Sequence, residues 1–282
     1  MTFALFPNSP AFVFWTVSGI NPVNRVIRLV LFVLSLALIA VVVQRCKRSS
    51  GSEAEIRRIV QTETAYFRPA VTVSGLIIDH LPRNARAGRY HAASKTGFQI
   101  AVTLKALLGT PGVTDGWLPQ QDWQRTRQDA RRSLLKLLHA VDQIQRSTEL
   151  RGFVPWGELQ DGRLHPSKTV REGIECIEIP AIDQGILAFA LAAVVGELHD
   201  SENDLELEIT RVASRILQRM DFNDFYDPVS GTMSGQILVF DDYWERDRHY
   251  RLDDFSESLL PVSFAVLHQQ VPSSTIRTCA PA

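Results

Sequence analysis

The segment from Ala181 to Leu198 constrains the fold of this chain of 282 residues more than any other. It is rich in alanine and apolar on nearly every side, so no face of it is suited to contact with water. A helix with this composition is stable only when neighbours bury it on all sides. We therefore expect an inner helix around which the remaining helices pack.

Further segments carry apolar residues at helical spacing. They cover residues 96–108, 124–145, 202–220 and 256–267. Ser201 followed by Asp204 predicts the N-terminal cap of the third segment, and Pro261 fits the fourth only near its first turn. Signals for strands are sparse and are limited to Gln236–Phe240 and Gly152–Trp156. The pattern predicts an all-α fold of helical hairpins, arranged in a ring.

A second apolar run, Leu29–Val43, contains only one polar residue, Ser35. It is shorter than a membrane span of about 20 residues, but Arg28 and Arg45 beside it can reach the two interfaces. We expect one transmembrane helix. A cleaved signal peptide is a weaker alternative, because no cleavage site of small residues follows. The flanking charges lean slightly towards a cytoplasmic C-terminal domain.

These features divide the chain into four parts. Residues 1–48 form an N-terminal segment with the anchor, and residues 49–53, which read SSGSE, form a linker. Residues 54–270 form the helical domain, and the polar residues 271–282 form an unstructured tail.

Composition excludes several classes of function. The net charge is −1, so no basic field exists that would hold nucleic acid. The 3 cysteines have neither the number nor the spacing of a disulfide framework or a zinc site. The sequence has no phosphate-binding loop, dinucleotide loop or HExxH motif. The run 221–227 resembles a calcium loop only loosely, because Phe225 stands where a ligand is needed. We expect neither cofactor nor metal.

Carboxylates cluster where two apolar helices begin. The run ECIEIPAID contains Glu178 and Asp183, and the run LDDFSE contains Asp254 and Glu257. Acids in such places commonly cap helices and complement the helix dipole. The functional interpretation is that both runs face one cleft, where paired carboxylates could hydrolyse a glycosidic bond.

Aromatic residues lie near both acidic runs. Trp156 precedes the first, and Trp244 and Tyr250 precede the second. Each of them alone is more simply explained by packing within a loop. Together with the acids they suggest a surface on which sugar rings stack, and we expect Trp156, Trp244, Tyr250 and Asp254 to bind substrate.

A series of motifs follows in a fixed order along the chain. They are SGLIID at 74–79, ASKTGF at 93–98, the segment 152–156, EIPAID at 178–183, the acidic aromatic stretch 215–226 and FSESL at 255–259. In this order they resemble the glycoamylase-like family. Its members include bacterial β-1,2-glucan-degrading enzymes and the glycan-processing domain of cyclic β-1,2-glucan synthases.

The resemblance implies an (α/α)6 toroid with its active site in a cleft at the N-terminal ends of the inner helices. It implies hydrolysis of a β-glucan, most simply one with β-1,2 linkages, with Glu178, Asp183 and Glu257 as catalytic acids. One acid would protonate the departing oxygen and another would activate water or attack the sugar. At least two of the three carboxyl groups should then lie within about 5 to 10 Å of each other. It also implies a domain outside the cytoplasm, at the bacterial inner membrane.

The chain departs from the family pattern in two respects. Gln184 and Gly185 follow the acid where relatives have Thr-Ala. The family also continues well beyond the last helix, so we expect a ring that is incomplete at its C terminus and that a partner chain could close. The alternative function is a catalytically silent helical scaffold or glycan-binding module at the membrane.

Overall fold

The computed structural model describes residues 53–70, 75–76, 90–117, 123–146, 150–161, 163–247, 250, 252 and 259–275. The chain divides into two compact units, residues 1–60 and 61–282. The second unit contains nearly all of the described residues. The expected membrane helix Leu29–Val43 and two of the expected site residues, Asp254 and Glu257, lie outside the described residues.

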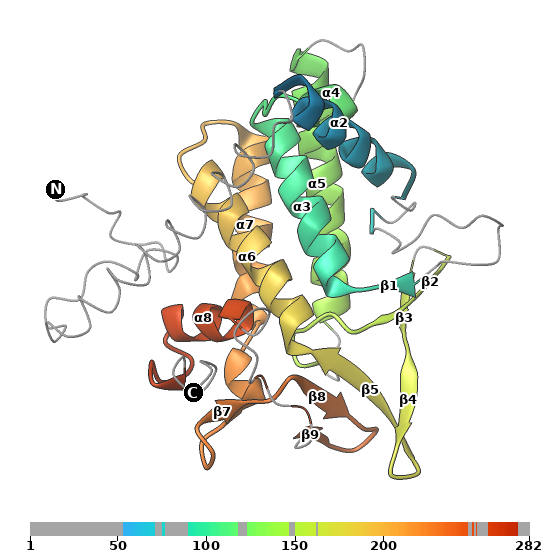
Figure 1. Ribbon diagram of the computed structural model, residues 1–282, viewed down its shortest axis with the longest axis vertical. Helices are drawn as coiled ribbons and strands as arrows, with labels where there is room; N and C mark the ends of the chain where they lie inside the picture. Colours follow the sequence, from blue (N-terminus) through green and yellow to red (C-terminus); the bar gives the residue numbers. More distant parts are fainter. Residues whose placement is uncertain are drawn as a thin grey trace, which may run out of the picture. The chain divides into compact units, whose positions relative to one another are not determined.

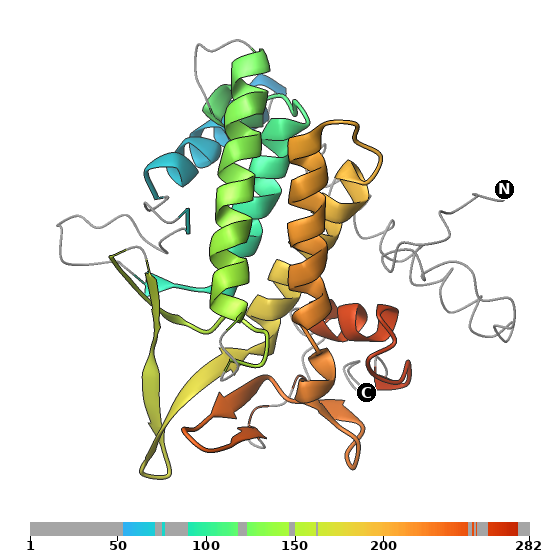
Figure 2. The ribbon, with the colours of Figure 1, turned by 180° about the vertical axis from the view of Figure 1, so that it is seen from behind.

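The protein is mostly helical, as the sequence predicts. Its helices are α2 (Glu53–Ala70), α3 (Ala93–Leu107), α4 (Val113–Trp117), α5 (Trp123–Gln145), α6 (Ala181–Leu198), α7 (Asp204–Arg219) and α8 (Leu259–Leu267), with a 3-10 turn, η3, at Phe222–Phe225. The apolar segment is confirmed as the inner helix α6, because α3, α7 and α8 pack around it (Figure 1). Helices α5 and α7 lie side by side, with α5 packed against α3 and α7 packed against α6 (Figure 2).

The core lies between α3 and α6. Ile100 and Leu104 of α3 and Leu187, Leu191 and Val194 of α6 are almost completely buried. Burial of one such side chain contributes about 1.5 to 3 kcal/mol. Within the part of the chain that the structure describes, α6 is also the one helix long and apolar enough to cross a membrane, although 56% of it is buried inside the protein. Its packing accounts for its composition without a membrane.

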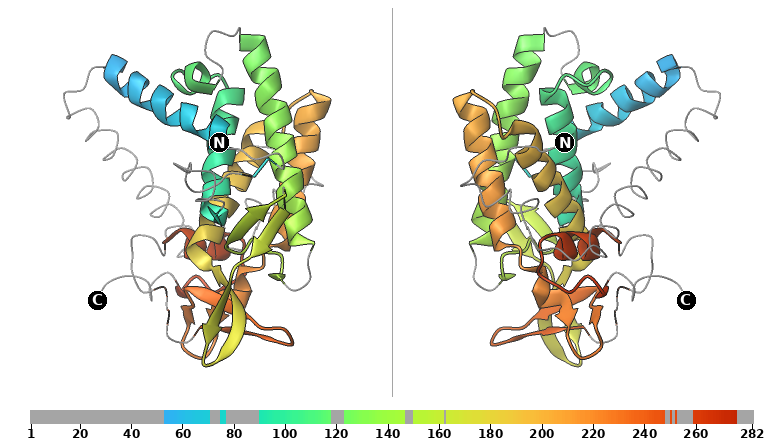
Figure 3. Two further views of the ribbon diagram at one scale, coloured as in Figure 1. Left: turned by 90° about the vertical axis from the view of Figure 1, so that its right-hand side faces the viewer. Right: turned by 90° about the vertical axis from the view of Figure 1, so that its left-hand side faces the viewer.

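The expectation of an all-α fold is wrong in one respect, because short strands connect the helices. They are β1 (Tyr90–His91), β2 (Gly157–Gln160), β3 (Arg163–Pro166), β4 (Lys168–Arg171), β5 (Ile174–Pro180), β6 (Tyr226–Asp227), β7 (Thr232–Met233), β8 (Gln236–Val239) and β9 (Trp244–Arg246). They form three antiparallel sheets in the orders β1-β2-β3, β4-β5-β8-β9 and β6-β7. Most of them gather at the end where α6 begins (Figure 3).

The two sequence signals for strands have different outcomes. The first, Gln236–Phe240, is confirmed as β8, which ends one residue earlier at Val239. The second, Gly152–Trp156, is wrong as a strand and is an irregular connection that leads into β2. It begins with Gly152 at φ +77°, where a Cβ would lie 2.2 Å from the Arg219 carbonyl oxygen. Only glycine fits there, because of both the left-handed backbone and the close approach.

The cap of α7 also differs from the prediction. The capping side chain is Asn203, whose Oδ1 accepts hydrogen bonds from the backbone N–H groups of Leu205 and Glu206, at 3.1 and 3.3 Å. Ser201 lies further back and donates its hydroxyl to the Glu206 carboxylate instead. An amide oxygen is as good a cap as a hydroxyl. In the last described helix, α8, Pro261 lies in the first turn as expected.

Candidate active site

Asp183 lies in the first turn of the inner helix α6, directly after strand β5. The junction is held by a hydrogen bond of 2.8 Å from the Ala181 N–H to the Gly235 carbonyl. Backbone N–H groups at such a helix end lack partners within the helix and favour negative charge nearby. The Asp183 side chain is half-buried, and its Oδ2 accepts a hydrogen bond from the indole Nε1 of Trp156. The structure therefore brings together two of the expected site residues.

Gln184 fixes the segment that carries Trp156. Its side-chain amide is completely buried and makes two hydrogen bonds with Val154. Oε1 accepts from the Val154 N–H at 3.1 Å, and Nε2 donates to the Val154 carbonyl at 2.7 Å. The residue after Asp183 thus holds the backbone two residues before Trp156. This makes the departure from the family's Thr a structural determinant of the site, which sequence reasoning missed.

Tyr90 is a second aromatic residue at this place, and no sequence motif singled it out. Strand β1 pairs with β2, and this sets Tyr90 opposite Glu158. The rings of Tyr90 and Trp156 have centroids 6.3 Å apart and planes inclined at 59°. Both rings are half-buried, so they form a partly open aromatic surface beside Asp183.

Glu178 lies on β5 and is bound to the neighbouring strand. Its Oε1 accepts hydrogen bonds from Nε of Arg171, at 3.0 Å, and from Nη2 of the same residue. The hydrogen bond and charge of Glu178 raise the pKa of Arg171 above its usual value. The Glu178 side chain is 16% exposed, so it is still partly open to solvent.

Trp244 lies on the other face of this sheet from Glu178. Glu178 pairs with Leu238, whereas Trp244 of β9 pairs with Val239, the next residue along β8. Paired residues share a face, and successive residues alternate between faces. The guanidinium of Arg151 also lies 4.2 Å from the centroid of the Trp244 ring. The structure thus does not bring Trp244 and Glu178 to one surface.

Tyr250 is 45% exposed. It is connected to the start of α6 through Gly235, which bonds to both. Its carbonyl accepts a hydrogen bond of 2.6 Å from the Gly235 N–H. A Cβ on Gly235 would lie 2.6 Å from the Tyr250 ring, so this contact also requires glycine. The Gly235 carbonyl binds the first residue of α6, which links Tyr250 to the helix that carries Asp183.

No group of three or more His, Cys, Asp or Glu side chains that could hold a metal ion occurs among the described residues. The separation expected between the three acids stays a prediction. A cavity of about 780 Å³ lies elsewhere, along α5, and none of the residues above lines it.

No family model matches this sequence, and no curated protein is similar to it in sequence. Solved structures are similar in fold. An endo-β-1,2-glucanase mutant from Talaromyces funiculosus, in complex with β-1,2-glucan, matches with a TM-score of 0.67 at 13% identity. The match covers 81% of this chain and 49% of that one, so this chain spans about half the length of the neighbour. The complex of the same glucanase with sophorose matches with the same values.

An endo-β-1,2-glucanase from Chitinophaga pinensis also matches, with a TM-score of 0.46 at 18% identity over 65% of this chain and 40% of that chain. The likeness to the Talaromyces glucanase confirms the resemblance to glycoamylase-like proteins at the level of the fold.

Proposed function

We propose that this chain is a glycoside hydrolase-like protein that acts on a β-glucan with β-1,2 linkages, with Asp183 at the centre of its site. One observation carries the proposal. A half-buried carboxylate in the first turn of the inner helix is bonded to a tryptophan, in a fold similar to that of an endo-β-1,2-glucanase. The resemblance of the motifs around EIPAID supports the same substrate class.

The hydrogen bonding of Asp183 suits a base or a nucleophile. An indole N–H only donates, so Asp183 Oδ2 accepts and is not the oxygen that carries a proton. The other oxygen, Oδ1, can then receive a proton from water or attack the sugar. The start of α6 stabilises negative charge at this place. We therefore assign Asp183 the role of activating water or attacking the anomeric carbon.

The proton donor is then Glu178 or Glu257. Glu178 uses Oε1 to bind Arg171, which leaves Oε2 open to the departing oxygen of the substrate. Glu257 is a candidate from the resemblance. A substrate with an activated aryl leaving group separates them, because such a group departs without help from an acid. The variant of the true donor, E178Q or E257Q, should lose far less activity on this substrate than on the glucan.

Trp156 and Tyr90 are proposed to stack against the sugar, because their rings adjoin each other beside the acid. Tyr250 and Asp254 are proposed as further contacts. Trp244 has a guanidinium over its ring, so we give it a lesser part in binding.

The test uses the full-length chain and linear β-1,2-glucan and measures new reducing ends. We expect release by the native protein and a loss of about 10²- to 10⁴-fold in kcat for Asp183→Asn. Glu208→Gln, which changes a partly exposed acid on α7, is the control and should keep its activity. Equal activity of D183N and the native protein would remove Asp183 from the mechanism.

A second candidate function is glucan binding without catalysis. It is favoured by one observation, the pairing of Glu178 with Arg171, which occupies one of the expected acids. In that case the native protein binds β-1,2-glucan but releases no reducing ends, and Trp156→Ala abolishes binding. A measurement of both binding and release separates the two functions.

The residues before the domain are proposed to attach it to a membrane. Under this proposal Leu29–Val43 spans the bilayer and residues 54–270 form a domain outside the cytoplasm. Recovery of the intact chain in the soluble fraction after a carbonate wash would contradict the anchor.

A further inference from the structure

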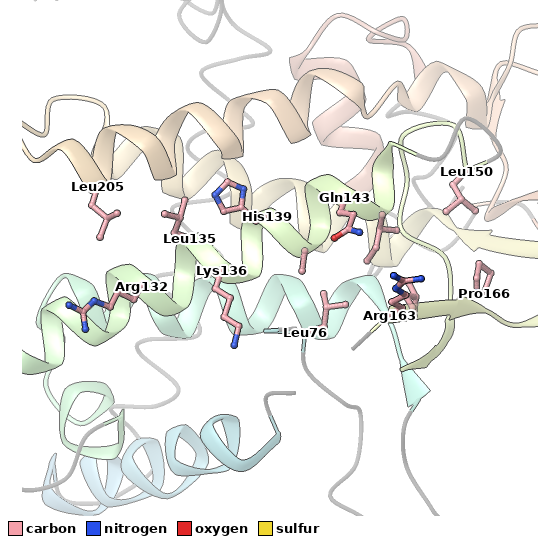
Figure 4. A pocket seen from close by; sticks show the side chains of 13 residues that line it. Leu76, Arg132, Leu135, Lys136, His139, Gln143, Leu150, Arg163, Pro166 and Leu205 are labelled. Atoms are coloured by element: carbon pink, nitrogen blue, oxygen red, sulfur yellow. The ribbon is translucent and has the colours of Figure 1, made fainter. Parts of the chain in front are cut away.

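The cavity along α5 has a volume of about 780 Å³ and is distinct from the acids of α6. Figure 4 shows its lining side chains along the length of the helix, from Leu205 and Arg132 at one end to Arg163 and Pro166 at the other. Small-molecule sites in proteins have volumes of roughly 300 to 1,000 Å³. The cavity is therefore large enough for a ligand.

Apolar side chains make up most of the wall, and several of them are half-exposed. Leu135 and Ile144 come from α5, Leu164 from β3 and Leu205 from α7. The part of α5 between Arg132 and Ile144 measures about 18 Å at 1.5 Å per residue. A long apolar wall of this kind suits an extended alkyl chain.

Three cations accompany this wall, namely Arg132, Lys136 and Arg163, and all three are exposed. Among the described residues none of them forms an ion pair, and no carboxylate lines the cavity. Other arginines of α5 behave differently. Arg131 binds Glu206 at 2.6 Å, and Arg146 binds Asp142 at 2.7 Å. Within the part of the chain that the structure describes, the cations at the cavity thus lack the carboxylate partners that their neighbours have.

The lining does not fit a sugar. Of its described residues none is Trp, Tyr or Phe, on which a ring could stack, and none is Asp or Glu, which could accept from hydroxyl groups. The combination of an apolar wall with unpaired cations instead matches a ligand with an apolar body and a negative head.

We propose that this cavity binds a single-chain anionic amphiphile, a long-chain fatty acyl carboxylate taken up as a free molecule. The alkyl chain lies along α5 against Leu135, Ile144 and Leu164, and the carboxylate is held by Arg132 and Lys136, which lie one helical turn apart towards one end of the cavity. This proposal does not depend on the glucan-hydrolysing function.

The test uses the full-length chain in nanodiscs of zwitterionic lipid and a photoreactive long-chain fatty acid as probe. Mass spectrometry locates the adducts. We expect them on α5 between residues 132 and 144 or on β3, and we expect excess palmitate, but not its uncharged methyl ester, to suppress them. Adducts elsewhere, or equal suppression by the ester, would overturn the proposal.

Two variants test the two features of the site. The triple variant R132Q/K136Q/R163Q should lower labelling about tenfold, which corresponds to about 1.4 kcal/mol. Ala140→Trp should block the cavity while it leaves the charges in place. Arg211→Gln, an exposed cation of α7 away from the cavity, is the matched control and should label like the native chain. A triple variant that labels normally would contradict the role of the cations, and circular dichroism confirms that each variant is folded.

Nanodiscs with phosphatidylglycerol distinguish a free ligand from a membrane surface. If these discs suppress labelling as strongly as palmitate does, the cations bind lipid headgroups and the proposal of a free amphiphile fails. If labelling persists, the free fatty acid is the ligand.

Discussion

The carboxylates between α5 and α7 differ from those at the start of α6 in how many donors occupy their oxygens. Asp142 and Glu206 have side chains that are only 3% exposed, and each binds two or more arginines. The partners of Asp142 are Arg146, Arg215 and Arg219, and those of Glu206 are Arg127 and Arg131. Burial alone would raise the pKa of Asp142, but the hydrogen bonds from its arginines outweigh burial and hold that pKa well below its usual range.

The acids near the start of α6 are half-buried and have fewer donors. Asp183 binds one indole N–H, and Glu178 binds one arginine through a single oxygen. Each therefore has an oxygen left for a water molecule or a substrate. Donors on both oxygens make an acid part of the scaffold, whereas an acid with one occupied oxygen remains available for chemistry.

Removal of a scaffold acid should have the largest effect. Asp142→Ala leaves its arginines without their shared partner between α5 and α7. Loss of one member of a buried ion pair costs about 3 to 5 kcal/mol, and we expect the lower end because these arginines are partly exposed. Urea unfolding followed by circular dichroism measures the change. Glu208→Ala, which breaks an exposed pair with Arg211, should cost less than about 0.5 kcal/mol. A loss below about 1 kcal/mol for D142A would break the distinction between the two groups of acids.

The same acids should make the fold sensitive to low pH. The usual pKa values are 3.8 for Asp142 and 4.5 for Glu206. For Glu206, too, burial alone would raise the pKa, but hydrogen bonds from Ser201 and Arg131 lower it overall. A depressed pKa in the folded state contributes stability above the usual pKa and loses it as the pH falls towards the folded value. The free energy of unfolding should thus drop below about pH 4.5 by roughly 1 kcal/mol or more.

The control for this pH effect is Glu206→Gln. It removes one of the two titrating groups, so its unfolding free energy should depend less steeply on pH between 5 and 3. An equal slope in both proteins would show that other groups cause the acid sensitivity.

A substitution of Gln184 tests whether its hydrogen bonds to Val154 hold Trp156 in place. Gln184→Met keeps the approximate volume but leaves the Val154 N–H and carbonyl without their partners. Leaving buried backbone groups unpaired costs about 1 to 3 kcal/mol. Because the same bonds position Trp156, kcat on the glucan should fall as well. Gln160→Met, on an exposed strand position, should change neither quantity. A Q184M variant with normal kcat would show that Trp156 is positioned without Val154.

The sequence predicted the helices better than their connections. The bounds of α6 were predicted to the residue, because a long segment that is apolar all round leaves few alternatives. Strands of two to four residues, such as β1 and β9, are too short to show a period. Strand β5 was interpreted only as the entry into α6, since its partner β8 is distant in sequence and the pairing is decided in three dimensions.

The candidate site could be predicted only in part, because some of its contacts join residues that are distant in sequence. Asp183 and Trp156 were named from a motif and a neighbouring aromatic, and they are in contact. Gln184 was noted only as a departure, because its bonds run to a backbone 30 positions away. Tyr90 had no signal at all, because strand pairing alone brings it to Trp156.

The smallest expected effect on stability is the sharpest test of Glu178. The hairpin β4–β5 carries two ion pairs of equal sequence separation, Arg171 with Glu178 and Lys168 with Glu175. The strand register puts them on opposite faces. Both pairs are partly solvent-exposed, so Arg171→Gln should change the free energy of unfolding by less than about 0.5 kcal/mol, and Lys168→Gln should leave it unchanged.

Their effects on catalysis should differ. The Glu178 side chain is 16% exposed, whereas that of Glu175 is 65% exposed. The orientation of Glu178 therefore depends on Arg171 and on the packing around it, whereas Glu175 is mostly surrounded by solvent. If Glu178 acts on the glucan, R171Q should lower kcat about fivefold or more, in line with a loss of about 1 kcal/mol in transition-state stabilisation, while K168Q has normal kcat. If both variants are fully active, Glu178 has no part in the reaction, and the chemistry must be carried by Asp183 with Glu257.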